Sequence, residues 1–319
     1  MEIVIVAGVA SLAWSLAALR LGPRLGYVDR PDDSPLKAHA APAVPLGGVG
    51  VFIGVHLAML VSTGEIDIWL LAATGIVLVL GLVDDRRGLP PVVRLACEGV
   101  AALVLALAVS GGDQGFVWVV LAVGLVVLAV NAVNLFDGLD GLAASVAIVT
   151  ALALAWLGVM RGVTVDAPLA LSGAVVGFLV LGWHPAKVFL GDAGAYVIGI
   201  VLAHAMLRSA PGEVDLIAAS SLLGVFVLDL VVTVLRRRRA RRPLFEGDRG
   251  HLYDQLRDRG WSVPRVVYLA VVAQAALVSV ALGIEWWLGP LAAISGLLAV
   301  GVLMLLVLTR RGFLESRPV

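Results

Sequence analysis

The chain contains eleven stretches of about 20 mostly apolar residues, and this pattern constrains its fold more than any other feature. A helix needs about 20 such residues to cross the hydrocarbon core of a bilayer. The stretches lack the alternation of a β-barrel strand, so we expect helices, which satisfy their backbone hydrogen bonds internally. The sequence therefore predicts an all-α polytopic membrane protein with spans at 2–21, 45–63, 66–83, 91–110, 115–131, 139–160, 167–183, 193–209, 214–235, 264–283 and 288–309.

The composition excludes a soluble or disordered chain. Hydrophobic residues make up 61% and charged residues 14%, with a mean hydropathy of +1.02, whereas soluble domains average about 45–50% and about 25%. Lys plus Arg and Asp plus Glu are equal at 23 each, so no basic excess indicates a nucleic-acid partner. The single cysteine, Cys97, excludes an intrachain disulfide and a cysteine zinc site.

The basic residues predict the orientation of the chain. All but two of the 23 Lys and Arg residues lie in the loops after odd-numbered spans or in the C-terminal tail; the exceptions are Arg161 and Arg208. Cytoplasmic loops are enriched in Lys and Arg, so we expect the N-terminus outside and the C-terminus in the cytoplasm. The first span has no basic segment before it, so we expect a retained helix in place of a signal peptide. No loop could form a soluble domain, so residues 1–319 are expected to form one domain of the cell membrane.

Four sequence-distant loops on the predicted cytoplasmic side carry carboxylates, amides or cations. They cover residues 84–87, 131–141, 184–194 and 247–251. Carboxylate and amide oxygens suit Mg²⁺, and Arg, Lys and His suit a diphosphate. The combination indicates phosphoryl-group chemistry with a metal ion at the cytoplasmic surface.

Simpler structural roles remain open for several of these residues. A solvated turn would explain the acidic pair at 84–85, and a helix N-cap would explain Asp192. Arg94 and Glu98 are spaced i, i+4, as in a local ion pair. Asp229 lies inside the ninth span, where an ionisable residue is either functional or paired with an arginine.

The polar motifs also occur in a recognisable order along the chain. They are Lys37-Ala38-His39 with Pro45-Leu46-Gly47-Gly48, Leu82-Val83-Asp84-Asp85, Asn131-x-x-Asn134-x-x-Asp137-Gly138-x-Asp140-Gly141, Phe189-Leu190-Gly191-Asp192-x-Gly194 and Asp248-Arg249-x-His251. In these motifs, over residues from about 29 to 260, the chain resembles the polyprenyl-phosphate N-acetylhexosamine-1-phosphate transferase family, which is of the glycosyltransferase family 4 type. That family's usual ten or eleven spans and cytoplasmic active site agree with the predicted topology.

The resemblance implies a phosphoglycosyl transferase. Such an enzyme transfers N-acetylhexosamine-1-phosphate from a UDP-sugar to polyprenyl phosphate, leaving UMP, at the start of cell-envelope glycan synthesis. It would require Mg²⁺ or Mn²⁺ and no nucleic acid, and a homodimer is left open. Phosphoryl transfer depends mostly on positioning and charge neutralisation, which fits these side chains.

The resemblance also implies roles for individual residues. The implied metal ligands are Asp192 and Asp85, and the Asp84/Asp85 pair would either support the metal or deprotonate the lipid phosphate. The implied catalytic residues are Asp84, Asp85, Asp137, Asp140 and His251, and the implied substrate-binding residues are Lys37, Arg94, Asn131, Asn134 and Arg249.

The chain departs from the family pattern at two places, and the first of them bears on the sugar donor. Tyr253 and Asp254 stand where the family commonly has further histidines, and Ala195 stands where it has Ser or Thr. The branch that uses UDP-MurNAc-pentapeptide generally has a longer chain and a His-rich last loop, so a donor like UDP-N-acetylglucosamine is favoured. The alternatives are that branch, a membrane transporter, whose ionisable residues would lie near the midplane, and an inactive scaffolding member, against which the intact acidic motifs argue.

Overall fold

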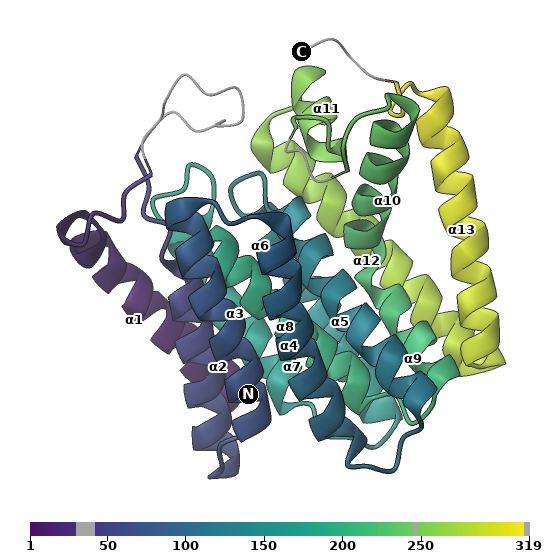
Figure 1. The fold of residues 1–319 in the computed structure, drawn as a ribbon, viewed down its shortest axis with the longest axis horizontal. Coiled ribbons are helices and arrows are strands. Elements are labelled where there is room, and N and C mark those ends of the chain that lie inside the picture. The colour runs from purple at the N-terminus through teal and green to yellow at the C-terminus, as the bar shows by residue number, and fades with distance from the viewer. Residues whose placement is uncertain (30–41, 245–247, 316–319) are drawn as a thin grey trace.

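The computed structural model describes residues 1–29, 42–244 and 248–315, and every regular element in them is helical. Two isolated β-bridges pair Asp29 with Ala43 and Val44 with Val188. The helices form a bundle with α11 and the end of α13 at its upper end in Figure 1. They are α1 (Glu2–Arg24), α2 (Gly47–Thr63), α3 (Ile68–Arg87), α4 (Pro91–Ser110), α5 (Phe116–Phe136), α6 (Leu142–Met160), α7 (Asp166–Gly182), α8 (Gly191–Arg208), α9 (Glu213–Ser220), the 3₁₀ turn η1 (Ser221–Leu223), α10 (Gly224–Arg239), α11 (Leu252–Asp258), α12 (Val263–Leu288) and α13 (Pro290–Arg310).

The predicted helical class is confirmed, whereas the predicted count of eleven spans is only partly supported. Each predicted segment coincides with a helix, the ninth being divided into α9, η1 and α10. Among the described residues, 8 helices are long and apolar enough to cross a membrane, with Glu213–Arg239 counted as one. Helices α2 and α7 are apolar but have only 17 residues each, and α8 is absent from both groups.

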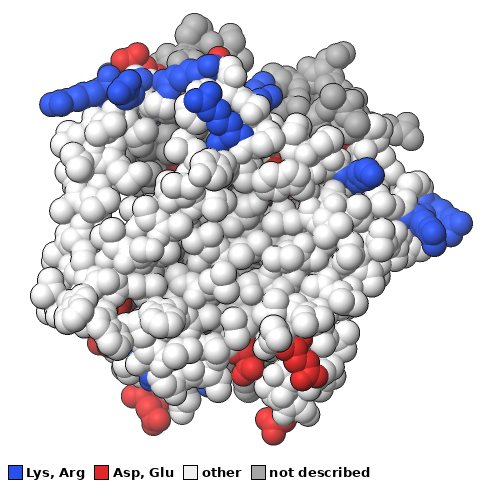
Figure 2. Space-filling model, turned by 180° about the vertical axis from the view of Figure 1, so that it is seen from behind, with Lys and Arg blue, Asp and Glu red and all other residues white. Residues whose placement is uncertain are grey.

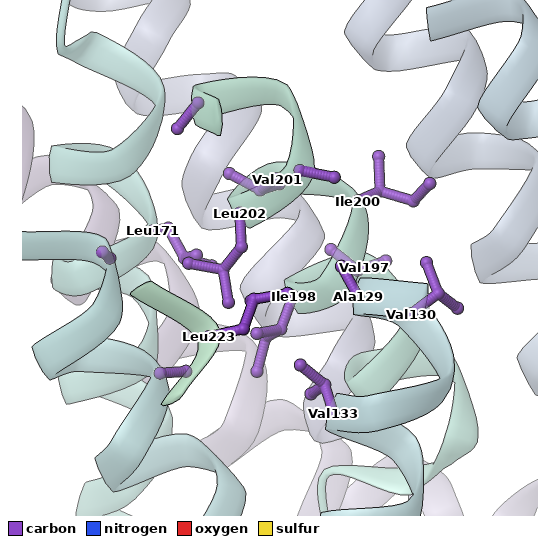
Figure 3. Packing of buried hydrophobic residues seen from close by; sticks show 14 of the residues in the cluster. Ala129, Val130, Val133, Leu171, Val197, Ile198, Ile200, Val201, Leu202 and Leu223 are labelled. Carbon is purple, nitrogen blue, oxygen red and sulfur yellow. The ribbon is translucent and has the colours of Figure 1, made fainter. Parts of the chain in front are cut away.

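Helix α8 lies at the centre of the bundle and is enclosed by protein. Every residue from Ala193 to Leu207 is buried, and α8 packs against α2, α3, α5 and α6. Figure 3 shows Val197, Ile198 and Val201 of α8 within the hydrophobic core, with Ala129 and Val130 of α5 beside Val197. A helix in this position can carry Asp192 and His204 because its neighbours shield it from lipid.

The closest helix contacts occur where glycine removes the side chain. A Cβ on Gly81 of α3 would lie 2.2 Å from the Cα of Ala193, and one on Gly48 of α2 would lie 2.2 Å from the amide nitrogen of Gly194. Small residues allow membrane helices to approach backbone to backbone. Because Gly81 lies one turn before Asp85, this approach brings the end of α3 against the first turn of α8.

The break between α9 and α10 is held by a buried glutamine. Gly224 has φ +28°, and the helix hydrogen bonds are interrupted there. Gln274 of α12, fully buried, donates to the Leu222 carbonyl at 2.7 Å and accepts from the Val225 amide at 2.9 Å. Its Nε2 also donates to Thr150 Oγ1 at 2.8 Å. These bonds satisfy backbone groups that a broken helix would otherwise leave unpaired.

Charged side chains gather at the two ends of the bundle and leave an apolar band between them. Figure 2 shows Lys and Arg mainly at the upper end and Asp and Glu mainly at the lower end. The band is white over most of this face, as expected for a surface in contact with lipid tails.

Candidate active site

A cavity of about 560 Å³ lies at the basic end of the bundle. Its walls come from the ends of α3 and α5, the start of α8 and the loops before α6 and α8. This volume is typical of a small-molecule site. Five aspartates line it: Asp29 and the four carboxylates of the sequence motifs, which belong to Asp85, Asp137, Asp140 and Asp192.

A hydrogen bond links Asp85 to Asp192. The Asp192 amide donates to Asp85 Oδ1 at 2.9 Å, and Asn134 Nδ2 donates to Asp192 Oδ1 at 2.7 Å. Asp85 Oδ2 is buried and has no hydrogen-bond partner among the described residues. Gly191 keeps φ +73°, and a Cβ there would come within 2.8 Å of that same oxygen. The glycine therefore leaves room beside an unpaired carboxylate oxygen.

Asp84 does not line the cavity and is engaged by protein. It accepts hydrogen bonds from the Leu89 amide at 2.6 Å, from Arg94 at 3.2 Å and from the Tyr196 hydroxyl at 3.0 Å. These contacts tie the end of α3 to α4 and α8. Asp84 and Arg94 therefore support the cavity without lining it. Arg94 pairs with Asp84, ten residues earlier in the chain, and not with Glu98.

Asp137 and Asp140 approach from the loop between α5 and α6. Burial and the nearby carboxylates of Asp192 and Asp85 raise the pKa of Asp137 to about 8. Asp140 accepts from His184 Nδ1 at 2.8 Å and from the Ala186 amide at 3.1 Å, which joins this loop to the one before α8. Carboxylates that lie close enough to raise one another's pKa also favour the binding of a cation.

No three His, Cys, Asp or Glu side chains among the described residues converge closely enough to form a complete metal site. The residues present nevertheless fit a Mg²⁺ ion that retains waters and binds substrate phosphates, because such an ion needs only one or two protein carboxylates. The buried unpaired oxygen of Asp85, beside Asp192, is the observation that supports this fit.

The segment around His251 docks against the last turn of α5. The Tyr253 hydroxyl donates to the Leu135 carbonyl at 3.1 Å, and its ring meets Phe136 edge-on. His251 stacks on Tyr253, is 4% exposed, and places Nδ1 2.6 Å from Asp229 Oδ2. Asp229 thus pairs with a histidine and not with an arginine.

Two arginines of the basic run hold the start of this segment. Arg236 makes two hydrogen bonds of 2.8 Å to Asp248, and Arg237 adds one of 3.1 Å. Burial alone would raise the pKa of Asp248, but these bonds outweigh it and hold the pKa at about 2. Arg236 and Arg237 are buried and therefore act in the structure of the loop, beyond any role in membrane orientation.

Asn131 and Arg249, two further predicted residues, do not line the cavity. Asn131 donates to Glu98 and to the Val127 carbonyl, and Arg249 lies 3.8 Å from both Asp254 and Asp258. Lys37 falls outside the described residues. The cavity also includes Arg257 and His184, to which the sequence motifs assign no role.

Comparison with known proteins places this chain in a family. Residues 68–210 match the model of glycosyl transferase family 4. Decaprenyl-phosphate N-acetylglucosaminephosphotransferase of Mycobacterium tuberculosis is 31% identical over 300 residues, covering 78% of this chain and 73% of the relative. The chain belongs to glycosyl transferase family 4.

More distant members have similar names. A probable undecaprenyl-phosphate N-acetylglucosaminyl 1-phosphate transferase of Bacillus subtilis is 27% identical over 263 residues, covering 76% of this chain and 73% of the relative. Undecaprenyl-phosphate alpha-N-acetylglucosaminyl 1-phosphate transferase of Yersinia pestis is 25% identical over 298 residues, covering 84% and 79%.

The family 4 match includes the cavity carboxylates of Asp85, Asp137, Asp140 and Asp192, but it leaves out Asp29 and ends before the segment around His251. In this family 4 member, Arg257 reaches the cavity from α11, a helix too short to have stood out among the apolar segments. His184 was visible in the sequence beside Lys187, and only its contact with Asp140 gives it a place in the site.

Proposed function

We propose that this protein transfers N-acetylglucosamine-1-phosphate, or a closely similar N-acetylhexosamine-1-phosphate, from a UDP-sugar to polyprenyl phosphate. The observation that carries the proposal is the aspartate-lined cavity at the end of an apolar helical bundle, where a charged nucleotide and a lipid phosphate can meet. The names of the relatives support the sugar and the lipid. Neither the muramoyl-pentapeptide branch nor a transporter is favoured by those names.

The reaction is a displacement at phosphorus. An oxygen of the lipid phosphate attacks the sugar-linked phosphorus of the UDP-sugar, forming a new P–O–P bridge. The bond from that phosphorus to the oxygen bridging to the uridine-linked phosphate breaks, and UMP leaves with that oxygen. The attacking phosphate is already largely anionic at pH 7, so the step requires charge neutralisation more than proton removal.

Mg²⁺ is the proposed cofactor, held by Asp85 and Asp192 with Asp137 nearby. A divalent ion bound here would neutralise charge on the diphosphate and on the departing UMP. Asn134 orients Asp192, and Asp84 orients the end of α3. Arg257 and His184 supply further donors at the cavity wall.

The proposed topology places the cavity in the cytoplasm, with the N-terminus outside and eleven spans in the cell membrane. The gathering of Arg and Lys at the cavity end supports this orientation. Helices α2, α7 and α8 complete the eleven because their partners in the bundle enclose much of their surface.

The decisive experiment is an assay of the purified chain in lipid nanodiscs with polyprenyl phosphate, Mg²⁺ and a panel of UDP-sugars. We expect UMP release with UDP-N-acetylglucosamine and a lipid-linked sugar diphosphate as the second product. The matched control replaces Asp192 with Asn, which preserves shape and removes one charge. UMP release only with UDP-MurNAc-pentapeptide, or none with any donor, would contradict the proposal.

Metal removal provides a separate prediction. Because the cavity carboxylates repel a diphosphate unless a cation is present, EDTA should abolish UMP release, and Mg²⁺ or Mn²⁺ should restore it. Loss of this charge neutralisation should lower the rate by at least about 10³. Full turnover in EDTA would refute the cofactor assignment.

A further inference from the structure

A second cavity, of about 430 Å³, lies at the end of the bundle opposite the four carboxylates. It is bounded by the first turns of α5 and α9 and the last residues of α8. Its polar lining comes from Gln114, Trp118, Arg161, Arg208, Ser209 and Asp215. The proposed reaction uses none of these residues.

Arg161 forms one wall of this cavity and has its charge offset. It donates to the Ser209 carbonyl and pairs with Glu285 and with Asp215, the latter at 3.2 Å. These contacts join the ends of α6, α8 and α12 to the start of α9. Glu285 and Asp215 are therefore already paired with Arg161, and they do not neutralise a second cation.

Arg208 and Trp118 provide two donors that protein does not satisfy. Arg208 is exposed in the last turn of α8 and makes no ion pair or hydrogen bond with the described residues. Trp118 is only 1% exposed, yet its indole N–H has no partner in the described part of the chain. A buried donor left unpaired costs about 1–3 kcal/mol, so an acceptor in this cavity would stabilise the protein.

The distribution of charge in the sequence makes the same cavity unusual. Arg161 and Arg208 are the two basic residues at this end of the predicted spans, and both line it. Basic residues at this end are disfavoured by the orientation bias that the other Lys and Arg residues follow. An unpaired arginine here therefore calls for an anionic partner. A phosphate group accepts from guanidinium and indole N–H together.

The surroundings favour a phosphate that carries acyl chains. Phe116 and Val117, next to Trp118, are 82% and 60% exposed, and Trp286 and Trp287, next to Glu285, are 62% and 80% exposed. Exposed aromatic residues at helix ends are typical of the membrane–water interface. We propose that this cavity binds the phosphodiester headgroup of a glycerophospholipid, with Arg208 and the Trp118 N–H as its donors.

Native mass spectrometry of the full chain in detergent tests the proposal with phosphatidylglycerol as the probe. We expect one retained lipid, and about tenfold weaker retention in Arg208→Gln, which removes the positive charge, and in Trp118→Phe, which removes the indole N–H. Arg310→Gln, an exposed arginine at the end of α13, is the matched control and should bind as the unmodified chain does. UMP release should be unchanged in Arg208→Gln, because Arg208 is at the far end of α8 from Asp192.

A second arm separates a lipid from a free anion. Millimolar inorganic phosphate should fail to displace the retained phosphatidylglycerol, because it lacks the acyl chains that would contact the exposed apolar residues. Full displacement by inorganic phosphate would overturn the lipid assignment. Equal lipid retention in Arg208→Gln and the unmodified chain would overturn the site itself.

Discussion

Asp84 and Asp85 are adjacent in the sequence and have opposite surroundings. Successive residues of a helix point about 100° apart, so one carboxylate faces α4 and α8 while the other faces the cavity. Asp84 accepts three hydrogen bonds from protein, whereas Asp85 keeps one buried oxygen free. The sequence alone could show that an acidic pair ends the helix, but not which member is available to a ligand, because that depends on Arg94 and Tyr196 from other helices.

The two aspartates should therefore respond differently to the same substitution. Asp85→Asn should lower UMP release by about 10³ or more with little change in thermal stability, since its free oxygen is available to a cation. Asp84→Asn should lower stability by about 1–3 kcal/mol through the weakened contact with Arg94, and reduce activity less. Thermal unfolding and kcat/KM measured on both variants check this. The reverse order of damage would contradict the assignment.

His251 forms a buried pair with Asp229, and replacing His251 should lower activity at the cavity. His251→Ala removes the partner of Asp229 and the ring that stacks on Tyr253, and Tyr253 hydrogen-bonds to the last turn of α5. We expect kcat/KM to fall by about 10–10². Asp254→Ala should be milder, because Asp254 is buried beside Arg249 and away from the cavity lining.

A double-variant comparison separates this pair from two independent effects. If His251 and Asp229 act together, Asp229→Asn combined with His251→Ala should cost little more in kcat/KM than His251→Ala alone. Fully additive losses would reject the coupling, and a more damaged Asp254→Ala than His251→Ala would reject the role of His251.

At the scale of helices, the site depends on how closely α3 and α8 approach. The apolar runs predicted both helices, since about 20 continuous apolar residues permit few other structures in lipid. They did not predict the break at Gly224, because the glutamine that stabilises it is about 50 residues away on α12. They also gave no sign that α8 is the central helix, which depends on the packing of four other helices.

Gly81→Ala should disturb the site, and Gly75→Ala should not. Both glycines lie in α3, but a Cβ at Gly81 would meet the backbone of Ala193 at 2.2 Å, whereas a Cβ at Gly75 would meet nothing within 4 Å. Separation of the helices would weaken the contact between Asp85 and Asp192. We expect about a tenfold or greater loss of UMP release for Gly81→Ala, with Gly75→Ala equal to or slightly more stable than the unmodified chain. Equal behaviour of the two variants would contradict this account.

At the scale of the whole molecule, the distribution of charged residues and the lengths of the apolar segments indicate one membrane domain whose two ends differ chemically. The cavity carboxylates could be anticipated from their motifs because each motif stands at the end of an apolar run. The second cavity could not, because Trp118, Arg161, Arg208 and Asp215 are separated by up to about 100 residues and belong to no motif.

Cysteine labelling tests the proposed orientation. In a Cys97→Ala background, an impermeant thiol reagent should modify Arg242→Cys only from the cytoplasmic side and Asp113→Cys only from outside; both positions are exposed and at opposite ends of the bundle. The expectation follows from the bias of Lys and Arg toward the cavity end. Modification of Arg242→Cys in intact cells by the external reagent would reject the topology.

The enclosure of α8 also has a consequence for biosynthesis. Helix α8 leaves the ribosome after α2, α3, α5 and α6, which are the helices that surround it. A segment that carries Asp192, His204 and Arg208 partitions poorly into lipid by itself. The helices that form its binding position in the bundle, however, have already been synthesised when α8 emerges. Its insertion should therefore depend on the assembly of its predecessors, and a mutation that weakens α2 or α3 should appear first as α8 left outside the membrane and degraded, before any effect on catalysis can be measured.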